Sequence, residues 1–124
     1  FYFEDLLLAE KFIELFREEK NYIKKLHLAF CAMNLMPFSE TYKILEFINS
    51  DDMWIQARAC ELLGEKKFEK AVPILADVAL NGTHNGRIAA MTALRNFNTL
   101  ESYNQIERLF NKVTDGYKIY LKSD

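Results

Sequence analysis

One pattern of residues, typical of helices, occurs twice in this sequence. The stretch WIQARACELLGEKKFEKAVPIL begins at Trp54, and the similar stretch NGRIAAMTALRNFNTLESYNQI begins at Asn85, 31 positions later. The positions that agree between the copies are small or apolar: Ile55, Ala59 and Leu63 align with Gly86, Ala90 and Leu94. A period of 30 to 31 residues that holds two helices is typical of an α-solenoid, in which helix pairs stack on one another.

The same pattern continues towards the N-terminus with a shift of 30. There Ala59 aligns with Ala29, and Phe68 aligns with Phe38. We expect the small residues Ala29, Ala59 and Ala90 to lie mid-helix, where a neighbouring helix approaches closely and a larger side chain would force the layers apart. Gly64 and Asn34 stand near the predicted ends of second helices, so we expect them to adopt the left-handed conformation of a C-cap.

The rest of the chain reads as helices joined by short turns, with no segment that resembles a strand. The 4 Gly and 2 Pro fall at or near expected breaks. Three helix starts are predicted from capping residues: Ser39 at one, Asp51 or Asp52 at another, and Asn98 with Glu101 in a capping-box pattern at a third.

These observations predict an all-α fold, a right-handed superhelix of about three helix pairs plus a truncated fourth. The predicted repeat units cover residues 4–34, 39–64, 68–96 and 100–122, in one domain over residues 1–124. Because the sequence starts at Phe1, inside or just before a helix, we expect it to be a fragment of a longer protein.

Composition limits the function classes that suit this chain. Its 124 residues carry 16 basic and 18 acidic side chains, so the formal net charge of −2 gives no strong field for nucleic acid or an anionic membrane. The longest apolar run, residues 28–33, is far too short to cross a bilayer. Cys31 and Cys60 both fall in helical apolar patterns, and we expect them to be buried or half-buried thiols of a reducing compartment.

The copy of the pattern that begins at Trp54 resembles the repeat of a known protein family. IQARACELLGEKKFEKAVPIL resembles the HEAT-like repeat of bacterial proteins, whose second helix reads Val-Arg-x-x-Ala-x-x-x-Leu-Gly. The matching places are Ile55, Gln56, Ala59, Leu63 and Gly64, and in the next unit Gly86, Arg87, Ala90, Leu94 and Arg95. A further unit is expected at DGYKIYLKSD, where Tyr117 and Lys118 take the first two places and Leu121 replaces the small residue. The resemblance implies architecture and says little about activity.

No arrangement of residues in the sequence points to catalysis. His27 and His84 are the only histidines, and neither stands in the His-Glu pairs from which some HEAT-like hydroxylases build a di-iron site. No zinc spacing, phosphate-binding loop or nucleophile motif is present. We therefore expect no catalytic, cofactor-binding or metal-binding residues, and we interpret the lysines at 66, 67 and 70 as solvated surface.

The exposed side of the second helices is the candidate binding surface. If Ile55, Ala59, Leu62 and Leu63 face the core, other positions of the same helices face outwards. The candidate partner-binding residues are His27, Cys31, Trp54, Ala57, Arg58, Glu61, Arg87, Ile88 and Thr92. Trp54 is the leading anchor, because exposed Trp commonly contributes much of the binding energy. It is alternatively a hydrophobic staple at the helix start.

The favoured function is a non-catalytic scaffold that binds a helix or peptide segment of another protein, with no cofactor and no nucleic acid. One alternative is a HEAT-like bilin lyase or other modifying enzyme, which would need a cavity around His27, Cys31 and Arg58. A nucleic-acid-binding solenoid is a weaker alternative. We expect a cytoplasmic location, either for a wholly soluble protein or for the cytoplasmic domain of a protein whose membrane anchor lies outside this segment.

Overall fold

All regular structure in this protein is helical. The computed structural model describes the backbone of residues 2–123 and the side chains of residues 3–112, and no strand occurs in that part of the chain. The elements are α1 (Tyr2–Glu18), α2 (Tyr22–Leu35), the 3-10 helix η1 (Phe38–Phe47), α3 (Met53–Glu65), the short 3-10 helix η2 (Glu69–Ala71), α4 (Val72–Asn81), α5 (His84–Phe97) and α6 (Leu100–Ser123). The all-α prediction is confirmed. None of the helices described is both long enough and apolar enough to cross a bilayer.

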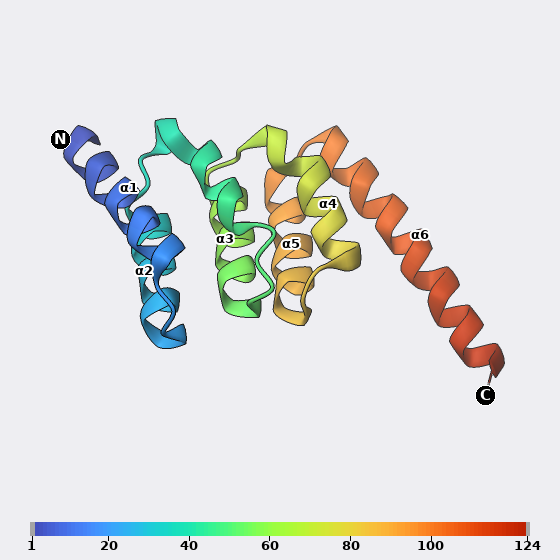
Figure 1. The fold of residues 1–124 in the computed structure, drawn as a ribbon. Helices are drawn as coiled ribbons and strands as arrows, with labels where there is room; N and C mark the ends of the chain where they lie inside the picture. Colours follow the sequence, from blue (N-terminus) through green and yellow to red (C-terminus); the bar gives the residue numbers. More distant parts are fainter. Residues whose placement is uncertain (1, 124) are drawn as a thin grey trace.

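The helices form an elongated array from α1 to α6, in which α5 lies next to α3, and α4 lies on the far side of α5 (Figure 1). Helix α1 packs mainly on α2, α3 packs mainly on α5, and α4 and α6 cover α5. Helices α2, α3 and α5 run in one direction, and the elements between them run back (Figure 1). Two successive second helices, α3 and α5, are therefore parallel neighbours.

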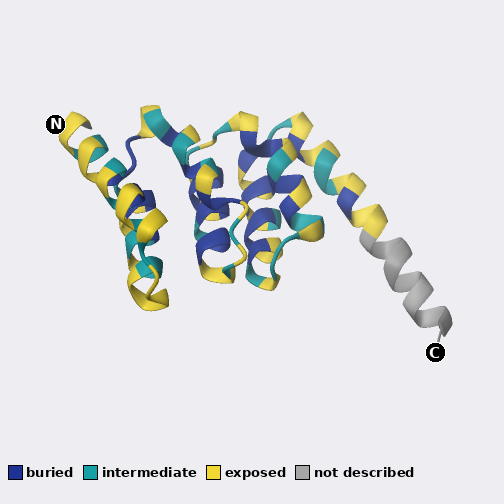
Figure 2. Cartoon of the chain, in the orientation of Figure 1, coloured by how far each residue is buried: buried dark blue, intermediate teal, exposed yellow. Residues whose placement is uncertain are grey.

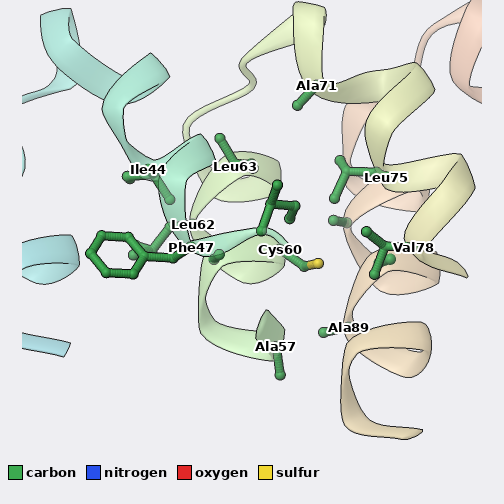
Figure 3. Close-up of a cluster of buried hydrophobic side chains, with 14 of the residues drawn as sticks. Ile44, Phe47, Ala57, Cys60, Leu62, Leu63, Ala71, Leu75, Val78 and Ala89 are labelled. Atoms are coloured by element: carbon green, nitrogen blue, oxygen red, sulfur yellow. The ribbon is translucent and has the colours of Figure 1, made fainter. Parts of the chain in front are cut away.

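The core is one continuous cluster of apolar side chains along this array. Buried residues are concentrated in α3, α4 and α5 (Figure 2). The four residues expected on the inward face of the second helix, Ile55, Ala59, Leu62 and Leu63, are at most 5% exposed. Phe47 of η1 and Leu75 of α4 close the cluster from either side of α3 (Figure 3).

Small residues allow α3 and α5 to approach each other closely. Ala29, Ala59 and Ala90 are completely buried, as their recurrence in the sequence predicts. Figure 3 shows Ala57 of α3 and Ala89 of α5 on the facing sides of the two helices.

The closest approach is at Gly64. A Cβ atom added at this glycine would lie 2.7 Å from the Ala93 Cβ and 2.8 Å from the Ala93 Cα, which is closer than carbon atoms pack. Only a residue without a side chain fits at this point.

The prediction that Gly64 and Asn34 form left-handed C-caps is wrong. Both residues lie within their helices, and the residues with positive φ are Lys67 and Asn98, each at 54°. At the end of α3 the Phe68 N–H donates to the Leu63 carbonyl, and the Lys67 N–H donates to the Gly64 carbonyl, which is a Schellman motif. Gly64 is required for helix contact, and the turn comes three residues later.

One of the predicted helix starts is confirmed. The Asp52 carboxylate accepts hydrogen bonds from the backbone N–H groups of Trp54 and Ile55, at 2.9 and 3.0 Å, and so caps α3. Ser39 does not cap a helix, because η1 begins at Phe38, follows Pro37 and has no side-chain cap. A chain that follows Pro37 enters a tight 3-10 turn directly, which leaves Ser39 inside the element.

The capping box predicted at Asn98 and Glu101 lies one residue further on. Asn98 ends α5 in the left-handed conformation. The Thr99 N–H donates to the Ser102 Oγ at 3.0 Å, and the Ser102 N–H donates to the Thr99 Oγ1 at 3.1 Å. This is the reciprocal pairing of a capping box, in which Thr99 is the N-cap residue of α6.

A buried amide joins the N-terminal ends of α3 and α5. The Gln56 Nε2 donates to the Ile48 carbonyl at 2.8 Å, and its Oε1 accepts from the Thr83 N–H at 2.8 Å and from the Thr83 hydroxyl at 2.7 Å. Gly86 leaves room for this amide, because an added Cβ would lie 2.1 Å from the Gln56 Oε1 and would displace it from Thr83. The start of α2 is held similarly, since the Tyr22 hydroxyl donates to the Asp52 carboxylate at 2.5 Å.

Two lysines join the C-terminal ends of the same helices. The Lys66 ammonium donates to the Met36 carbonyl at the end of α2 at 2.9 Å, and the Lys67 ammonium donates to the Asn96 carbonyl near the end of α5. A positive charge at these carbonyls is favoured by the helix dipole. Burial also lowers the pKa of Lys66. The interpretation as solvated surface is therefore wrong for Lys66, which is half-buried, whereas Lys67 and Lys70 are exposed.

Helix α6 is continuous from Leu100 to Ser123. The new repeat helix that the sequence alignment places at Tyr117 therefore does not begin with a break in the backbone. The positions that were aligned there, Tyr117, Lys118 and Leu121, have side chains outside the described residues.

Gly64→Ala is expected to lower the free energy of unfolding by about 1–3 kcal/mol, because the new methyl group overlaps Ala93. Chemical denaturation followed by circular dichroism measures this change. The exposed neighbour Glu65→Ala is the control and should change stability by less than about 0.5 kcal/mol. In an Ala93→Gly background the loss should be smaller, although the contact with the Cα of residue 93 remains. Equal losses in both backgrounds would contradict the assignment of the clash to Ala93.

Gln56→Leu is expected to cost about 2–4 kcal/mol of unfolding free energy. The substitution keeps the size of the side chain but leaves the Ile48 carbonyl and the Thr83 N–H without their partner. Gln105→Leu, at a half-buried glutamine of α6, is the matched control. If thermal and urea denaturation show the same stability for both variants, the hydrogen bonds of the Gln56 amide do not stabilise the fold.

Candidate functional site

A groove of about 710 Å³ runs along the exposed sides of α3 and α5. It is lined by Phe30, Trp54, Ala57, Arg58, Glu61, Asn85, Ile88, Ala89 and Thr92. Eight of these nine residues form four pairs at the repeat distance of 31: Trp54 with Asn85, Ala57 with Ile88, Arg58 with Ala89, and Glu61 with Thr92. The repeat therefore builds the groove, because parallel helices place equivalent positions side by side.

Two large apolar side chains stand exposed in this groove. Trp54 is 52% exposed and Ile88 is 59% exposed, and they come from opposite walls. Because Trp54 follows the N-cap Asp52, it does not occupy the staple position, which precedes the cap. The Asp52 cap fixes the backbone of Trp54 and so positions its indole.

The charged groups of the groove are held by one another. The Arg58 guanidinium donates to the Glu61 carboxylate at 3.0 Å and to the Asn34 Oδ1 at 3.1 Å, and it lies 3.9 Å from the Glu65 carboxylate. This arrangement ties α3 to the end of α2. Glu65 does not line the groove, but it lies close enough that Arg58, Glu61 and Glu65 together carry a net charge of −1.

Three of the predicted surface residues lie outside the groove. His27 and Cys31 are exposed on α2, but they do not line it. Helix α2 packs mainly on α1, so its row of equivalent positions does not meet α3, and only Phe30 of α2 reaches the groove. Arg87 lines an adjoining hollow, which shares Ile88 and Thr92 with the groove.

The structure brings together Trp54, Ala57, Arg58, Glu61, Ile88 and Thr92, and it adds residues that sequence reasoning missed. Phe30, Asn85 and Ala89 were not predicted. The signal for two of them was present, since Asn85 and Ala89 are the repeat equivalents of Trp54 and Arg58. Whether these residues bind a partner stays a prediction.

The largest cluster of charged residues outside the groove lies between α1 and η1. It lines a smaller hollow of about 340 Å³, where the Lys43 ammonium donates to Glu10 at 3.1 Å and the Arg17 guanidinium donates to Glu46 at 2.5 Å. These hydrogen bonds raise the pKa values of Lys43 and Arg17, so the groups are held in charged, paired form. In the described part of the chain, no three His, Cys, Asp or Glu side chains are grouped so that they could hold a metal ion.

The two cysteines occupy different surroundings. Cys60 of α3 is completely buried in the apolar core, and burial raises the pKa of its thiol to about 12. Cys31 is exposed, which contradicts the expectation that both thiols are buried or half-buried. The apolar residues around Cys31 in the sequence, Ala29, Ala32 and Met33, are buried, but Cys31 itself lies on the exposed side of α2.

Comparison with known proteins gives no relative for this chain. No protein-family model matches it, and no curated protein or solved structure matches it significantly. The function must therefore be inferred from the groove itself.

Thiol labelling should distinguish the two cysteines. At pH 8 in native buffer, a maleimide reagent is expected to modify Cys31 within minutes, while Cys60 stays unmodified until the protein is unfolded. The reason is that Cys60 is both inaccessible and protonated. Mass spectrometry of tryptic peptides, with urea-unfolded protein as the control, measures this. Equal labelling of the two in native buffer would show that the packing around Cys60 is wrong.

Proposed function

We propose that this chain is a non-catalytic interaction scaffold that binds a helix or peptide segment of another protein in the groove between α3 and α5. The fold that we propose for it is the HEAT-like, right-handed solenoid, with three helix pairs and α6 as the truncated fourth unit. The proposal includes a cytoplasmic location, which suits two free thiols, in a soluble protein or in the cytoplasmic domain of an anchored one.

The ties between neighbouring helices support the solenoid. Tyr22 to Asp52, Gln56 to Thr83 and Lys67 to Asn96 are hydrogen-bonded pairs separated by 30, 27 and 29 residues. Contacts that recur at about one repeat length are expected when each unit packs on the next. The parallel arrangement of α3 and α5 agrees with this.

The observation that carries the binding proposal is the pairing of the exposed apolar residues across the groove. Trp54 and Ile88 line opposite walls of the groove, and each is about half exposed. Between them the buried residues Ala57 and Ala89 form a floor without long side chains. A groove with small residues in its floor and large apolar residues on both walls suits the ridge of an amphipathic helix. The polar rim of Glu61, Asn85 and Thr92 can pair with the polar flank of such a helix.

The rival proposal, a HEAT-like lyase or other modifying enzyme, has less support. It requires a cavity at which His27, Cys31 and Arg58 converge, and only Arg58 lines the groove. A nucleic-acid partner is likewise less supported, because the single arginine of the α3 wall is paired with Glu61 and lies 3.9 Å from Glu65.

Replacing the two apolar side chains is expected to abolish partner binding. Trp54→Ala should weaken the complex by about 30-fold, as for a Trp at the centre of an interface, and addition of Ile88→Glu should abolish it. The measurement is site-specific photo-crosslinking from position 92 in the host lysate, quantified by mass spectrometry, with the same variants.

Phe38→Ala is the control, because Phe38 is an exposed aromatic residue outside the groove. It should leave the crosslinked species unchanged. Crosslinks that persist in the Trp54→Ala Ile88→Glu variant, or the absence of any specific crosslink, would overturn the proposal.

A further inference from the structure

The outer side of α5 forms a second, shallower hollow that continues the groove. Its volume is about 420 Å³, and it is lined by Ala79, His84, Arg87, Ile88, Met91, Thr92 and Arg95. Ile88 and Thr92 belong to both hollows, so α5 forms a ridge between them. Among residues 3–112, whose side chains are described, no acidic residue lines this hollow.

The two arginines of this hollow differ from the other arginines that contact a cavity. Arg17 and Arg58 are held by Glu46 and Glu61, at 2.5 and 3.0 Å. Arg87 and Arg95 are exposed, and within the described residues neither forms an ion pair or a side-chain hydrogen bond. Their guanidinium groups therefore have all of their donors available to a ligand.

These arginines are spaced for a ligand that lies along the helix. Arg87 and Arg95 are eight positions apart, which is about 12 Å along α5. Met91 lies between them in sequence and lines the same hollow. A stripe with a cation at each end and apolar residues between them complements a helix whose apolar face is bordered by carboxylates.

The opposite wall carries the opposite charge. There Glu61 lines the groove and Glu65 lies just outside it, and both share the single guanidinium of Arg58, so the three groups carry a net negative charge. A ligand with acidic residues on both flanks would be repelled from α3. The groove therefore distinguishes the two flanks of a bound helix.

We propose that the ligand of this groove is an acidic amphipathic helix, bound with its apolar face on Trp54 and Ile88 and its carboxylates on Arg87 and Arg95. This inference rests on the proposed function and specifies the partner. Arginine suits the role because its planar guanidinium pairs with a carboxylate through two parallel hydrogen bonds. The geometry also sets the orientation, with the acidic flank towards α5 and away from Glu61 and Glu65.

Three synthetic peptides of roughly 20 residues test the proposal. They share the same apolar face and carry Glu, Gln or Lys along the flank, and none contains Trp. Trp54 is the only tryptophan of the chain, so its fluorescence reports directly on the groove. Titration into the full chain should give a dissociation constant for the Glu peptide that is about tenfold lower than for the Lys peptide.

Charge reversal identifies the groups responsible. In the variant Arg87→Glu Arg95→Glu, the preference for the Glu peptide should disappear. The control Arg108→Glu reverses an exposed arginine of α6 outside both hollows and should leave the preference unchanged.

Different failures identify which proposal is wrong. If all three peptides bind equally, the acidic-helix inference is overturned while the proposed function stands. If none of them changes Trp54 fluorescence or a labelled peptide's anisotropy, the proposed function itself is overturned. Tighter binding of a duplex oligonucleotide, lost in Arg87→Glu Arg95→Glu, would overturn both in favour of a nucleic-acid partner.

Discussion

The close approach of α3 and α5 is the constraint on which the rest of this structure depends. It exists because Gly64 has no side chain where Ala93 lies and because alanines occupy the facing positions. At this distance, equivalent repeat positions of the two helices come side by side, and the exposed ones become the opposite walls of one groove. A wider separation would leave the same residues on two independent surfaces, as happens on α2, where His27 and Cys31 have no counterpart facing them.

Hydrogen bonds at the helix ends keep this approach in register. At one end the Gln56 side chain hydrogen-bonds to the Ile48 carbonyl and to the Thr83 N–H and hydroxyl. At the other end the Lys66 and Lys67 ammonium groups donate to backbone carbonyls at the ends of α2 and α5. Gln56 occupies the place where the HEAT-like pattern has arginine. An uncharged amide suits this buried position, because a buried arginine would need a charged partner, and no acidic side chain hydrogen-bonds to the residue at this place.

The helical fold and most of the groove could be predicted from the sequence, because a 31-residue period determines which residues are equivalent. The buried alanines and six of the nine groove residues follow from that period, and the Asp52 cap follows from the capping preference of aspartate. What could not be predicted depends on how far one helix lies from the next. From the sequence alone Gly64 resembles a C-cap residue, because glycine is found both at helix-ending turns and where two helices come into close contact. The exposure of Cys31 depends on α2 packing mainly on α1 and only to a small extent on α3, which no local pattern records.

The two edges of the helix array differ in stiffness. At the edge that contains the N-termini of α3 and α5, a buried amide with short hydrogen bonds to both sides allows little movement. At the other edge, the connections are lysine side chains with four-carbon stems, which can lengthen and rotate at low cost. Bending of the array therefore opens the lysine edge and leaves the Gln56 edge closed, as a hinge does. Trp54 lies at the closed end of the groove, and Thr92 lies nearer the open end. A bound helix is therefore held in place at the Trp54 indole, and its larger side chains fit towards the open end.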